Sequence, residues 1–395
     1  MSAHSTASGS SDSIHGYPEE DLRTDGKNNP GYFPARLGQT LDEGRYYRGE
    51  DTFVALKILT CKASKAMSPG KDQLSDEKEM LENITITDTK HEGYPHTIRH
   101  LGTFEFKGPQ GSHCCIVTEP LGYSLDYVRK LRDGGDLRVA PSIVKRVTKH
   151  ILLGLAYLHD VCGIVHGDLK HDNILFRPLD VKTIVAHELV ANPSVTYDCG
   201  TKVNPPVVPV VSQSLPVSPD PVINEKHSKQ LTIAQAHWQS RHFQEFIQPA
   251  ALRAPEVILG YPWGAPADIW NLGCLVAELL IGFFLFESHH EKSWDYDEDH
   301  LARMTEALQT SFEPSFLNRC VHRDGFFKAD GSFSHFTKHE EPTWPLRKLL
   351  ETFSDFPAEE IPLAESFLRR CLRLTPEERA TAKDLLDDPW LVDSA

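Results

Sequence analysis

Several features that define special classes of protein are missing from this sequence. No stretch approaches the ~20 consecutive apolar residues that a membrane-spanning helix needs, so we expect no membrane partner. Residues 1–13 are rich in serine and have no apolar core, so we expect no signal peptide. None of the eight cysteines belongs to a C-x-x-C pair, and we expect reduced, mostly buried thiols in an intracellular protein.

Positive charge is also scarce. The chain has 41 lysines and arginines against 56 aspartates and glutamates, which gives a formal net charge of −15. This balance argues against direct binding of nucleic acid and favours a basic partner. The 395 residues, of which 40% are hydrophobic and 25% are charged, are enough to bury a large core in an ordinary globular protein.

One polar cluster lies between two short apolar runs. In residues 164–175, I-V-H-G-D-L-K-H-D-N-I-L, the pattern predicts a strand, a tight loop and a second strand. The spacing H-x-D-L-x-x-x-N resembles the catalytic loop of protein kinases except at one position. That resemblance implies that Asp168 would accept a proton from an attacking hydroxyl, Lys170 would hold a transferred phosphoryl group, and Asn173 would ligate Mg²⁺. The structural alternative is a turn with chance polar residues, which the ordered motifs elsewhere in the chain disfavour.

A lone lysine and a following acid mark the amino-terminal part. Residues 51–60 are β-branched and apolar, which predicts a strand, and they contain Lys57 in the run V-A-L-K. Residues 72–84 have apolar positions three or four apart, which predicts a helix. Glu77 or Glu79 on this helix is the candidate partner of Lys57. We favour Glu77 because of its place on the face expected to turn inward.

The middle of the chain combines regular segments with an irregular one. We expect two strands joined by a Gly-Pro turn and then two helices, at 97–106, 113–119, 124–132 and 141–159. Residues 177–229 are rich in proline, valine and serine without a regular period, and we interpret them as an inserted, mostly unstructured loop with extended pieces. We interpret residues 1–30, which are rich in Ser, Gly, Asp and Asn, as a disordered tail.

Three short motifs follow in the carboxy-terminal half. Glu256 lies in A-P-E, Asp268 lies in A-D-I-W at the start of a strongly apolar helix, and Arg379 lies in R-A-T-A. A buried Asp268 would hold the backbone of the polar loop at 164–175. Arg379 would form a buried ion pair with Glu256 that holds this half of the chain together.

In their order these motifs resemble those of the eukaryotic protein kinases, over residues 31–393. The resemblance implies the α+β, bilobal protein kinase fold. We expect a small, β-rich and truncated N-lobe with the hinge at 31–122. We expect a large helical C-lobe at 123–395, interrupted by the insert at 177–229.

The same resemblance implies ATP and Mg²⁺ as cofactors. Lys57, paired with Glu77, would hold the phosphates of ATP, and backbone groups near Glu119 and Leu121 would bind its adenine. Asn173 would contribute to the metal site.

Within the kinases, the chain resembles the SR-protein kinases of fungi. Residues 32–38, Y-F-P-A-R-L-G, are similar to their Y-H-P-V-x-x-G-D, and residues 119–122, E-P-L-G, are similar to their E-V-L-G. Gly167 stands where most kinases have an arginine, as their H-T-D loop also lacks it, and a spacer follows the loop. The resemblance implies a monomeric Ser/Thr kinase in cytoplasm and nucleus that acts on basic Arg/Ser-rich proteins such as splicing factors. It also implies activity without phosphorylation of the activation segment.

Two family motifs are missing. The run between Gly44 and Val54 has no G-x-G-x-x-G, and its one glycine, Gly49, precedes two acids whose charges would repel phosphates. No D-F-G or D-L-G is present either, and the sequence around Ala234 and Gln235 reads as its two flanks with three residues absent. The metal site is therefore short of anionic oxygens. Degeneration of the chain or an imperfect gene model would each produce these absences.

Three functions compete on this evidence. The first is an active Ser/Thr protein kinase that transfers the γ-phosphate of ATP, which the intact catalytic loop favours. The second is a pseudokinase or scaffold that binds Arg-rich partners without turnover, which the two missing motifs favour. The third, a binding protein unrelated to kinases, is made remote by the ordered motifs.

An acidic stretch is the candidate docking surface. Residues 287–299 are the most acidic part of the large lobe. The resemblance implies an acidic groove nearby that captures Arg-rich segments, and Asp295, Asp297 and Glu298 are the candidate contacts because carboxylates bind arginine forks. The alternative is a solvated loop whose acids stabilise the start of the next helix, expected at 299–308.

Overall fold

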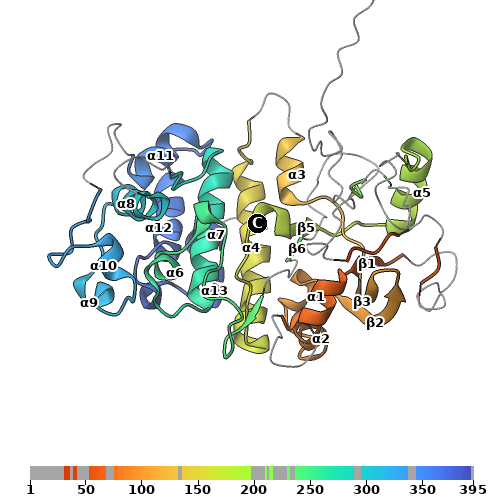
Figure 1. Cartoon of the computed structure of the whole chain (residues 1–395). Coiled ribbons are helices and arrows are strands. Elements are labelled where there is room, and N and C mark those ends of the chain that lie inside the picture. The colour runs from red at the N-terminus through yellow and green to blue at the C-terminus, as the bar shows by residue number, and fades with distance from the viewer. Residues whose placement is uncertain are drawn as a thin grey trace, which may run out of the picture. The chain divides into compact units, whose positions relative to one another are not determined.

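The structure, a computed structural model, describes residues 31–35, 39–41, 53–67, 75–131, 136–196, 210, 213–216, 229–231, 236–288, 295–336 and 344–392. The chain divides into two compact units, each made of segments that are distant in sequence (Figure 1). The first unit takes residues 1–73, 101–122 and 178–223, and the second takes residues 74–100, 123–177 and 224–395. The helix expected at 72–84 therefore groups with the second unit.

A three-stranded sheet forms the centre of the first unit. Its order is β1-β3-β2, with β1 at Ala55–Ile58, β2 at His100–Gly108 and β3 at Gly111–Thr118. β1 runs antiparallel to β3, and Lys57 lies opposite Ile116. Cys115 and Val117 of the apolar strand β3 pack with Phe104 in the core of this unit. A short helix, α1 (Cys61–Ala66), follows β1 and is capped by the side chain of Thr60.

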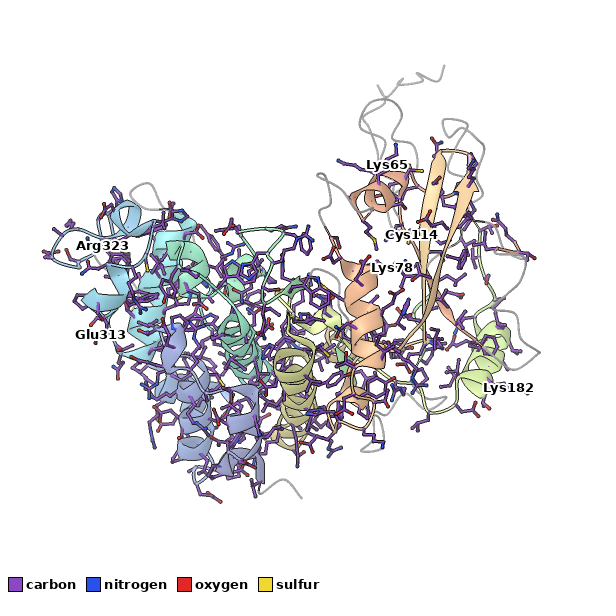
Figure 2. All side chains as sticks on the ribbon, turned by 90° about the horizontal axis from the view of Figure 1, so that it is seen from below. Lys65, Lys78, Cys114, Lys182, Glu313 and Arg323 are labelled. Atoms are coloured by element: carbon purple, nitrogen blue, oxygen red, sulfur yellow. The ribbon has the colours of Figure 1, made fainter. Side chains whose placement is uncertain are left out.

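Part of the predicted irregular insert is helical. Helix α5 (Val181–Ala191) lies inside the stretch 177–229, so the expectation of a mostly unstructured loop is wrong for these residues. Asp180 caps the helix by accepting a hydrogen bond from the backbone N–H of Thr183, and Ile184 is its only buried residue. The apolar residues of α5 lie on several of its sides, with Leu189 and Val190 exposed, so they form no single stripe in the sequence. Figure 2 shows Lys182 on the outer side of this helix.

The second unit is mainly helical. Its longer helices are α2 (Glu77–Ile86), α4 (Pro141–Ala156), α7 (Ala265–Ile281), α8 (Tyr296–Leu308), α11 (Leu346–Phe353) and α12 (Ile361–Cys371). Its shorter helices are α3 (Leu125–Lys130), α6 (Pro255–Leu259), α9 (Pro314–Leu317), α10 (Arg323–Phe326), α13 (Ala382–Leu386) and α14 (Pro389–Val392). Two strand pairs complete it: β4 (Ile164–Val165) with β7 (His237–Trp238), and β5 (Ile174–Phe176) with β6 (Lys229–Leu231).

Helix α7 is the centre of the second unit. All residues from Ala267 to Ile281 are buried, and α4, α11 and α12 pack around the helix (Figure 1). A helix that is apolar on every side must be covered on every side. Gly282 ends it in a left-handed conformation, with φ of 89°, which glycine adopts without steric cost. Among the described residues, no helix is long and apolar enough to cross a membrane.

The predicted elements are present with shifted ends. The strand expected at 51–60 is confined to Ala55–Ile58, and the helix expected at 72–84 begins at Glu77 after Asp76. The helix expected at 299–308 begins earlier, at Tyr296, because Asp295 caps it. The expected tail at 1–30, the run between Gly44 and Asp51 that lacks the glycine motif, and the junction at Ala234 and Gln235 lie outside the described residues.

Candidate active site

Two short antiparallel ladders hold the polar loop at its ends. Ile164 and Val165 of β4 pair with Trp238 and His237 of β7. The other end of the loop continues into β5, which pairs with β6. The residues between β4 and β5 therefore form a loop of fixed length between two anchored strands, as the sequence pattern predicts.

Within this loop the three predicted catalytic side chains meet. The amide nitrogen of Asn173 donates to the Asp168 carbonyl oxygen at 2.8 Å and to its carboxylate oxygen Oδ2 at 2.9 Å. The Nζ atom of Lys170 lies 3.1 Å from the same Oδ2. Asp168 is 8% exposed, so its carboxylate is held by neighbours and not by bulk water alone. The arrangement fixes one carboxylate beside one cation.

Asp268 of α7 holds the backbone of the loop, as predicted from the sequence. Its two carboxylate oxygens accept hydrogen bonds from the backbone N–H groups of His166 at 2.7 Å and Gly167 at 2.8 Å. His159 Nε2 lies 2.8 Å from Oδ2. Complete burial opposes ionisation of Asp268, but these hydrogen bonds hold its pKa below the ordinary value. Gly167 has φ of 70°, a left-handed conformation that suits glycine.

A second buried cluster, formed by Arg129, His171 and Glu278, also contacts the loop. It was not predicted from the sequence. The guanidinium of Arg129 lies 2.9 Å from Nε2 of His171 and donates to Glu278 Oε1 at 2.9 Å. Burial, together with the nearby cations Arg129 and Lys130, lowers the pKa of His171 to about 3, so this imidazole is neutral at physiological pH. His171 lies inside the motif itself, but Arg129 had no sequence signal because α3 carries several basic residues.

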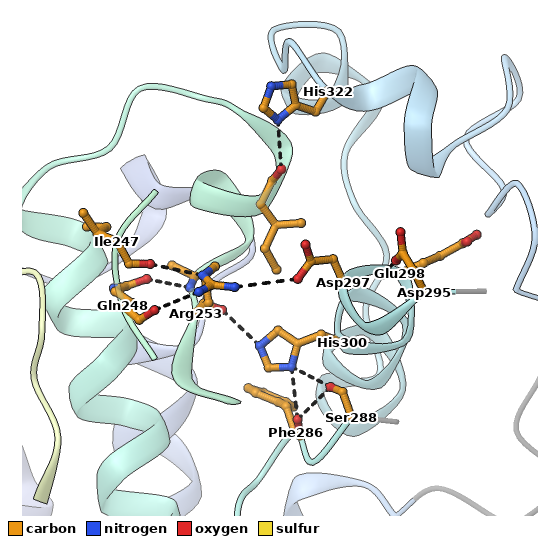
Figure 3. A network of polar contacts seen from close by, with 12 residues as sticks. Ile247, Gln248, Arg253, Phe286, Ser288, Asp295, Asp297, Glu298, His300 and His322 are labelled. Carbon is orange, nitrogen blue, oxygen red and sulfur yellow. Dashed lines mark hydrogen bonds and ion pairs between the residues drawn. The ribbon is translucent and has the colours of Figure 1, made fainter. Parts of the chain in front are cut away.

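Gln248 joins the loop to the segment before A-P-E, and it was also missed. Its backbone N–H donates to the Gly167 carbonyl at 3.2 Å, and its side chain accepts from Ala254 N–H and donates to the Ala267 carbonyl, both at 2.8 Å. Gln248 has φ of 72°, which costs energy for a residue with a Cβ. Arg253 donates to its carbonyl oxygen at 2.9 Å (Figure 3).

The buried ion pair expected between Glu256 and Arg379 is present. Both side chains are fully buried, and the guanidinium donates to the two carboxylate oxygens at 2.6 Å each. Arg379 also donates to the Pro266 carbonyl at 2.9 Å and lies 5.0 Å from the ring centre of Trp270. The pair thus links the A-P-E motif, the start of α7 and the R-A-T-A motif.

The predicted nucleotide contacts belong to different units. Lys57 is exposed on β1, and Glu119 and Leu121, directly after β3, are partly buried in the first unit. Glu77 is 8% exposed at the start of α2 in the second unit. The pairing of Lys57 with Glu77, and the adenine contacts at 119–121, remain predictions.

The three candidate docking acids have different surroundings (Figure 3). Asp295 is exposed and caps α8, accepting a hydrogen bond from the Glu298 N–H at 2.8 Å. Asp297 lies 3.8 Å from Arg253, and its burial raises its pKa although Arg253 opposes the shift. Glu298 is only 2% exposed and accepts from the backbone N–H groups of His335 and Phe336. Glu298 is therefore not a surface acid, contrary to the expectation that it contacts a partner.

Around Asp168 and Asn173, the residues that the structure describes do not complete a site for Mg²⁺. The amide nitrogen of Asn173 is committed to Asp168, so Asn173 offers one neutral oxygen. Mg²⁺ prefers several oxygen ligands, including carboxylates, and the sequence has no D-F-G or D-L-G motif to supply another. Among the residues that the structure describes, no three His, Cys, Asp or Glu side chains are grouped as a metal site.

The protein kinase fold has a small unit built on a sheet and a helical unit centred on one buried helix. It also has an Asp-Lys-Asn loop held by a buried aspartate. The family model described as "Protein kinase domain" matches residues 46–202 and 230–391, so the chain belongs to the protein kinase family. A solved structure, described as that of the PF14_0431 kinase domain, covers 86% of this chain and is itself covered to 87%. It has a TM-score of 0.60 and 21% identity, which supports the bilobal fold alone.

Within the kinases the chain is similar to SR-protein kinases. "Serine/threonine-protein kinase SRPK" of Physarum polycephalum is 30% identical, over 95% of this chain and 92% of that protein. "Protein kinase dsk1" of Schizosaccharomyces pombe is 26% identical, over 91% of this chain and 83% of that protein. "SRSF protein kinase 3" of Sus scrofa is 23% identical, over 91% of this chain and 88% of that protein. These matches confirm the resemblance found in the sequence.

Proposed function

We propose that this chain is a Ser/Thr protein kinase of the SR-protein kinase type. It would transfer the γ-phosphate of ATP to serine hydroxyls of basic, Arg/Ser-rich proteins. The observation that supports the proposal is the gathering of Lys170 and Asn173 around the carboxylate of Asp168.

The residues of the loop support the chemistry in the following way. The carboxylate of Asp168 would accept the proton of the substrate serine as its oxygen attacks the phosphorus atom. Asn173 fixes the orientation of that carboxylate through the hydrogen bond to Oδ2. Lys170 carries a positive charge beside the carboxylate, where it would bind the phosphoryl group during transfer. Asp268 keeps the loop backbone in place through His166 and Gly167.

The relatives and the charge of the chain support a basic substrate. One relative is named "SRSF protein kinase 3", and a net charge of −15 attracts a basic chain at long range. We also propose a location in cytoplasm and nucleus. The seven cysteines among the described residues are free and buried, as expected in a reducing compartment.

A second candidate is a pseudokinase that binds Arg-rich partners without turnover. The observation that favours it is the incomplete Mg²⁺ site, together with the missing glycine motif. Asp168, Lys170 and Asn173 remain in place under either proposal, so only a measurement of turnover separates them.

A transfer assay tests the proposal. The chain is incubated with labelled ATP, Mg²⁺ and an Arg-Ser repeat peptide, with an Arg-Ala repeat as the unreactive control. An active kinase would place label in the Arg-Ser peptide, and that transfer should fall by roughly 10²–10⁴-fold in Asp168→Ala because the proton acceptor is removed. Asp172→Ala, which changes the nearby exposed aspartate, is the matched control and should keep the activity.

Two outcomes would contradict this proposal. Activity that survives Asp168→Ala would remove the proposed role of that carboxylate. No transfer by the unaltered chain, while it still binds the Arg-Ser peptide, would favour the pseudokinase.

A further inference from the structure

The amino-terminal end of α2 is attached to the second unit by a buried carboxylate. Asp76 is 7% exposed, accepts a hydrogen bond from the indole N–H of Trp238 at 2.8 Å, and lies 3.5 Å from Nη1 of Arg241. Asp76 occupies the N-cap position of α2 but makes no side-chain capping bond, and Ser75 Oγ accepts from the Glu77 N–H at 3.2 Å instead. The Asp76 carboxylate is therefore committed to contacts outside its own helix.

Trp238 and Arg241 are themselves tied to the catalytic loop. Trp238 is in β7 and pairs with Ile164 of β4, the strand that leads into the loop. The next residue, Gln239, donates from its backbone to Gly163 and from its side chain to the His159 carbonyl, both at 2.9 Å. A displacement of α2 would thus pull on the strand that positions Asp168.

The other end of α2 is attached to the same part of the unit. Tyr157 is fully buried in the π-helix η4 (Tyr157–Cys162), which directly precedes β4. Its hydroxyl donates to the Ile84 carbonyl at 2.7 Å and accepts from the Asp88 N–H at 3.2 Å. Both ends of α2 therefore contact elements next to β4, the strand that leads into the catalytic loop.

We propose that Asp76 is a positioning residue, which with Trp238 and Arg241 fixes α2 against the catalytic loop. Glu77, the predicted partner of Lys57, directly follows Asp76, so this contact also fixes the backbone from which Glu77 projects. The Asp76 carboxylate is buried, the hydrogen bond from Trp238 is partly buried, and about half of the Arg241 side chain is exposed, so the hydrogen bond from Trp238 is the stronger of the two contacts. Its relevance to phosphoryl transfer rests on the proposed function, whereas its role in holding α2 does not.

Hydrogen–deuterium exchange of the whole chain tests the attachment directly. Trp238→Phe removes the indole N–H and keeps an aromatic ring, and Asp76→Ala removes the acceptor. Each variant should raise amide exchange in α2 by roughly tenfold, with the larger effect in Asp76→Ala because it also removes the ion pair with Arg241. The double variant should raise exchange no further than Asp76→Ala alone, since that change already removes the partner of Trp238. Exchange in α12 should stay unchanged. Asp180→Asn changes the aspartate at the N-cap position of α5, in the first unit, and is the control that should leave α2 unchanged.

The transfer assay gives the second readout. Each variant should lower kcat with little change in the KM for the Arg-Ser peptide, which a general loss of stability would not produce below the melting temperature. If the unaltered chain shows no turnover, the proposed function fails but the exchange result still decides the positioning role. Unchanged exchange in α2 for both variants would overturn the inference, as would equal increases in α2 and α12.

Discussion

Several charged side chains of the second unit are almost completely buried, and each contacts groups of opposite charge or backbone dipoles. The Asp268 carboxylate accepts hydrogen bonds from two backbone N–H groups. The carboxylates of Glu278 and Glu256 accept hydrogen bonds from the guanidinium groups of Arg129 and Arg379, respectively. Such charges are costly to bury, so removing one partner costs much more than removing an exposed pair. At the scale of residues, these pairs decide where the motifs lie relative to one another within the unit.

The Glu256–Arg379 pair allows a direct stability test. Arg379→Met leaves the Glu256 carboxylate buried without its cation, and we expect a loss of about 3–5 kcal/mol in the free energy of unfolding. The double variant Glu256→Gln/Arg379→Met should recover part of that loss because no charge remains buried. Urea unfolding followed by circular dichroism measures both.

An exposed pair of similar length provides the control. Arg347 and Glu351 lie 2.9 Å apart on α11 with roughly half of each side chain exposed, so Glu351→Gln should cost less than about 1 kcal/mol. Equal losses for Arg379→Met and Glu351→Gln would contradict the structural role of the buried pair.

At the scale of elements, long buried apolar segments were predicted correctly as helices or strands, whereas a helix without a continuous apolar face was not predicted. The apolar run that became α7 and the strand that became β3 were visible because their burial is continuous. Helix α5 was missed because its apolar residues, such as Ile184 and the exposed Leu189 and Val190, lie on different sides and form no periodic stripe. Helix ends shifted where a capping residue, such as Asp295, lies outside the apolar pattern.

The proposed catalytic residues could be found in the sequence for a different reason. Asp168, Lys170 and Asn173 lie within six residues, so a short motif carries their geometry. Arg129, Gln248 and Asp76 contact the loop or its neighbours from distant parts of the chain. A single sequence contains no signal for such contacts, because any of many polar residues could make them.

The acids before and at the start of α8 provide the prediction at this scale. We expect Asp295→Ala/Asp297→Ala to weaken binding of an Arg-Ser repeat peptide by roughly fivefold at low salt and less at moderate salt, since both carboxylates are at least partly exposed. Glu298→Gln should lower stability but not peptide affinity, because Glu298 binds the backbone at His335 and Phe336. Isothermal titration calorimetry measures the affinities.

The control variant must have the same net charge as Asp295→Ala/Asp297→Ala. Asp324→Ala/Asp330→Ala removes two exposed acids elsewhere in the second unit and should leave the affinity almost unchanged. If both double variants weaken binding equally, the effect comes from total charge and the docking assignment fails. Unchanged affinity in Asp295→Ala/Asp297→Ala would also reject it.

At the scale of the whole molecule, the second unit holds Asp168, Lys170 and Asn173 together, while two motifs with which kinases bind the nucleotide are missing from the sequence. The buried contacts of Asp268 and of Glu256 with Arg379 keep the helical unit in the form expected of a kinase. The sequence, in contrast, has neither the glycine motif before β1 nor the metal-binding aspartate after β6. Loss of nucleotide binding would not by itself abolish binding of a protein partner, because a protein partner requires no metal.

A measurement of ATP binding tests whether the missing motifs weaken the nucleotide site. We expect ATP to stabilise the unaltered chain weakly and almost equally with and without Mg²⁺, since Asn173 alone offers too few oxygens to bind the metal with the phosphates. Inserting Asp-Leu-Gly between Ala234 and Gln235 supplies the missing carboxylate. This variant should gain a Mg²⁺-dependent stabilisation, which reaches about 2.7 kcal/mol when ATP is at a hundred times its Kd. A thermal-shift titration with and without Mg²⁺ compares the two chains, and Lys57→Met in the inserted chain tests whether the gain requires the predicted phosphate contact. A large Mg²⁺-dependent shift in the unaltered chain would show that other residues complete the metal site and would favour the active kinase over the pseudokinase.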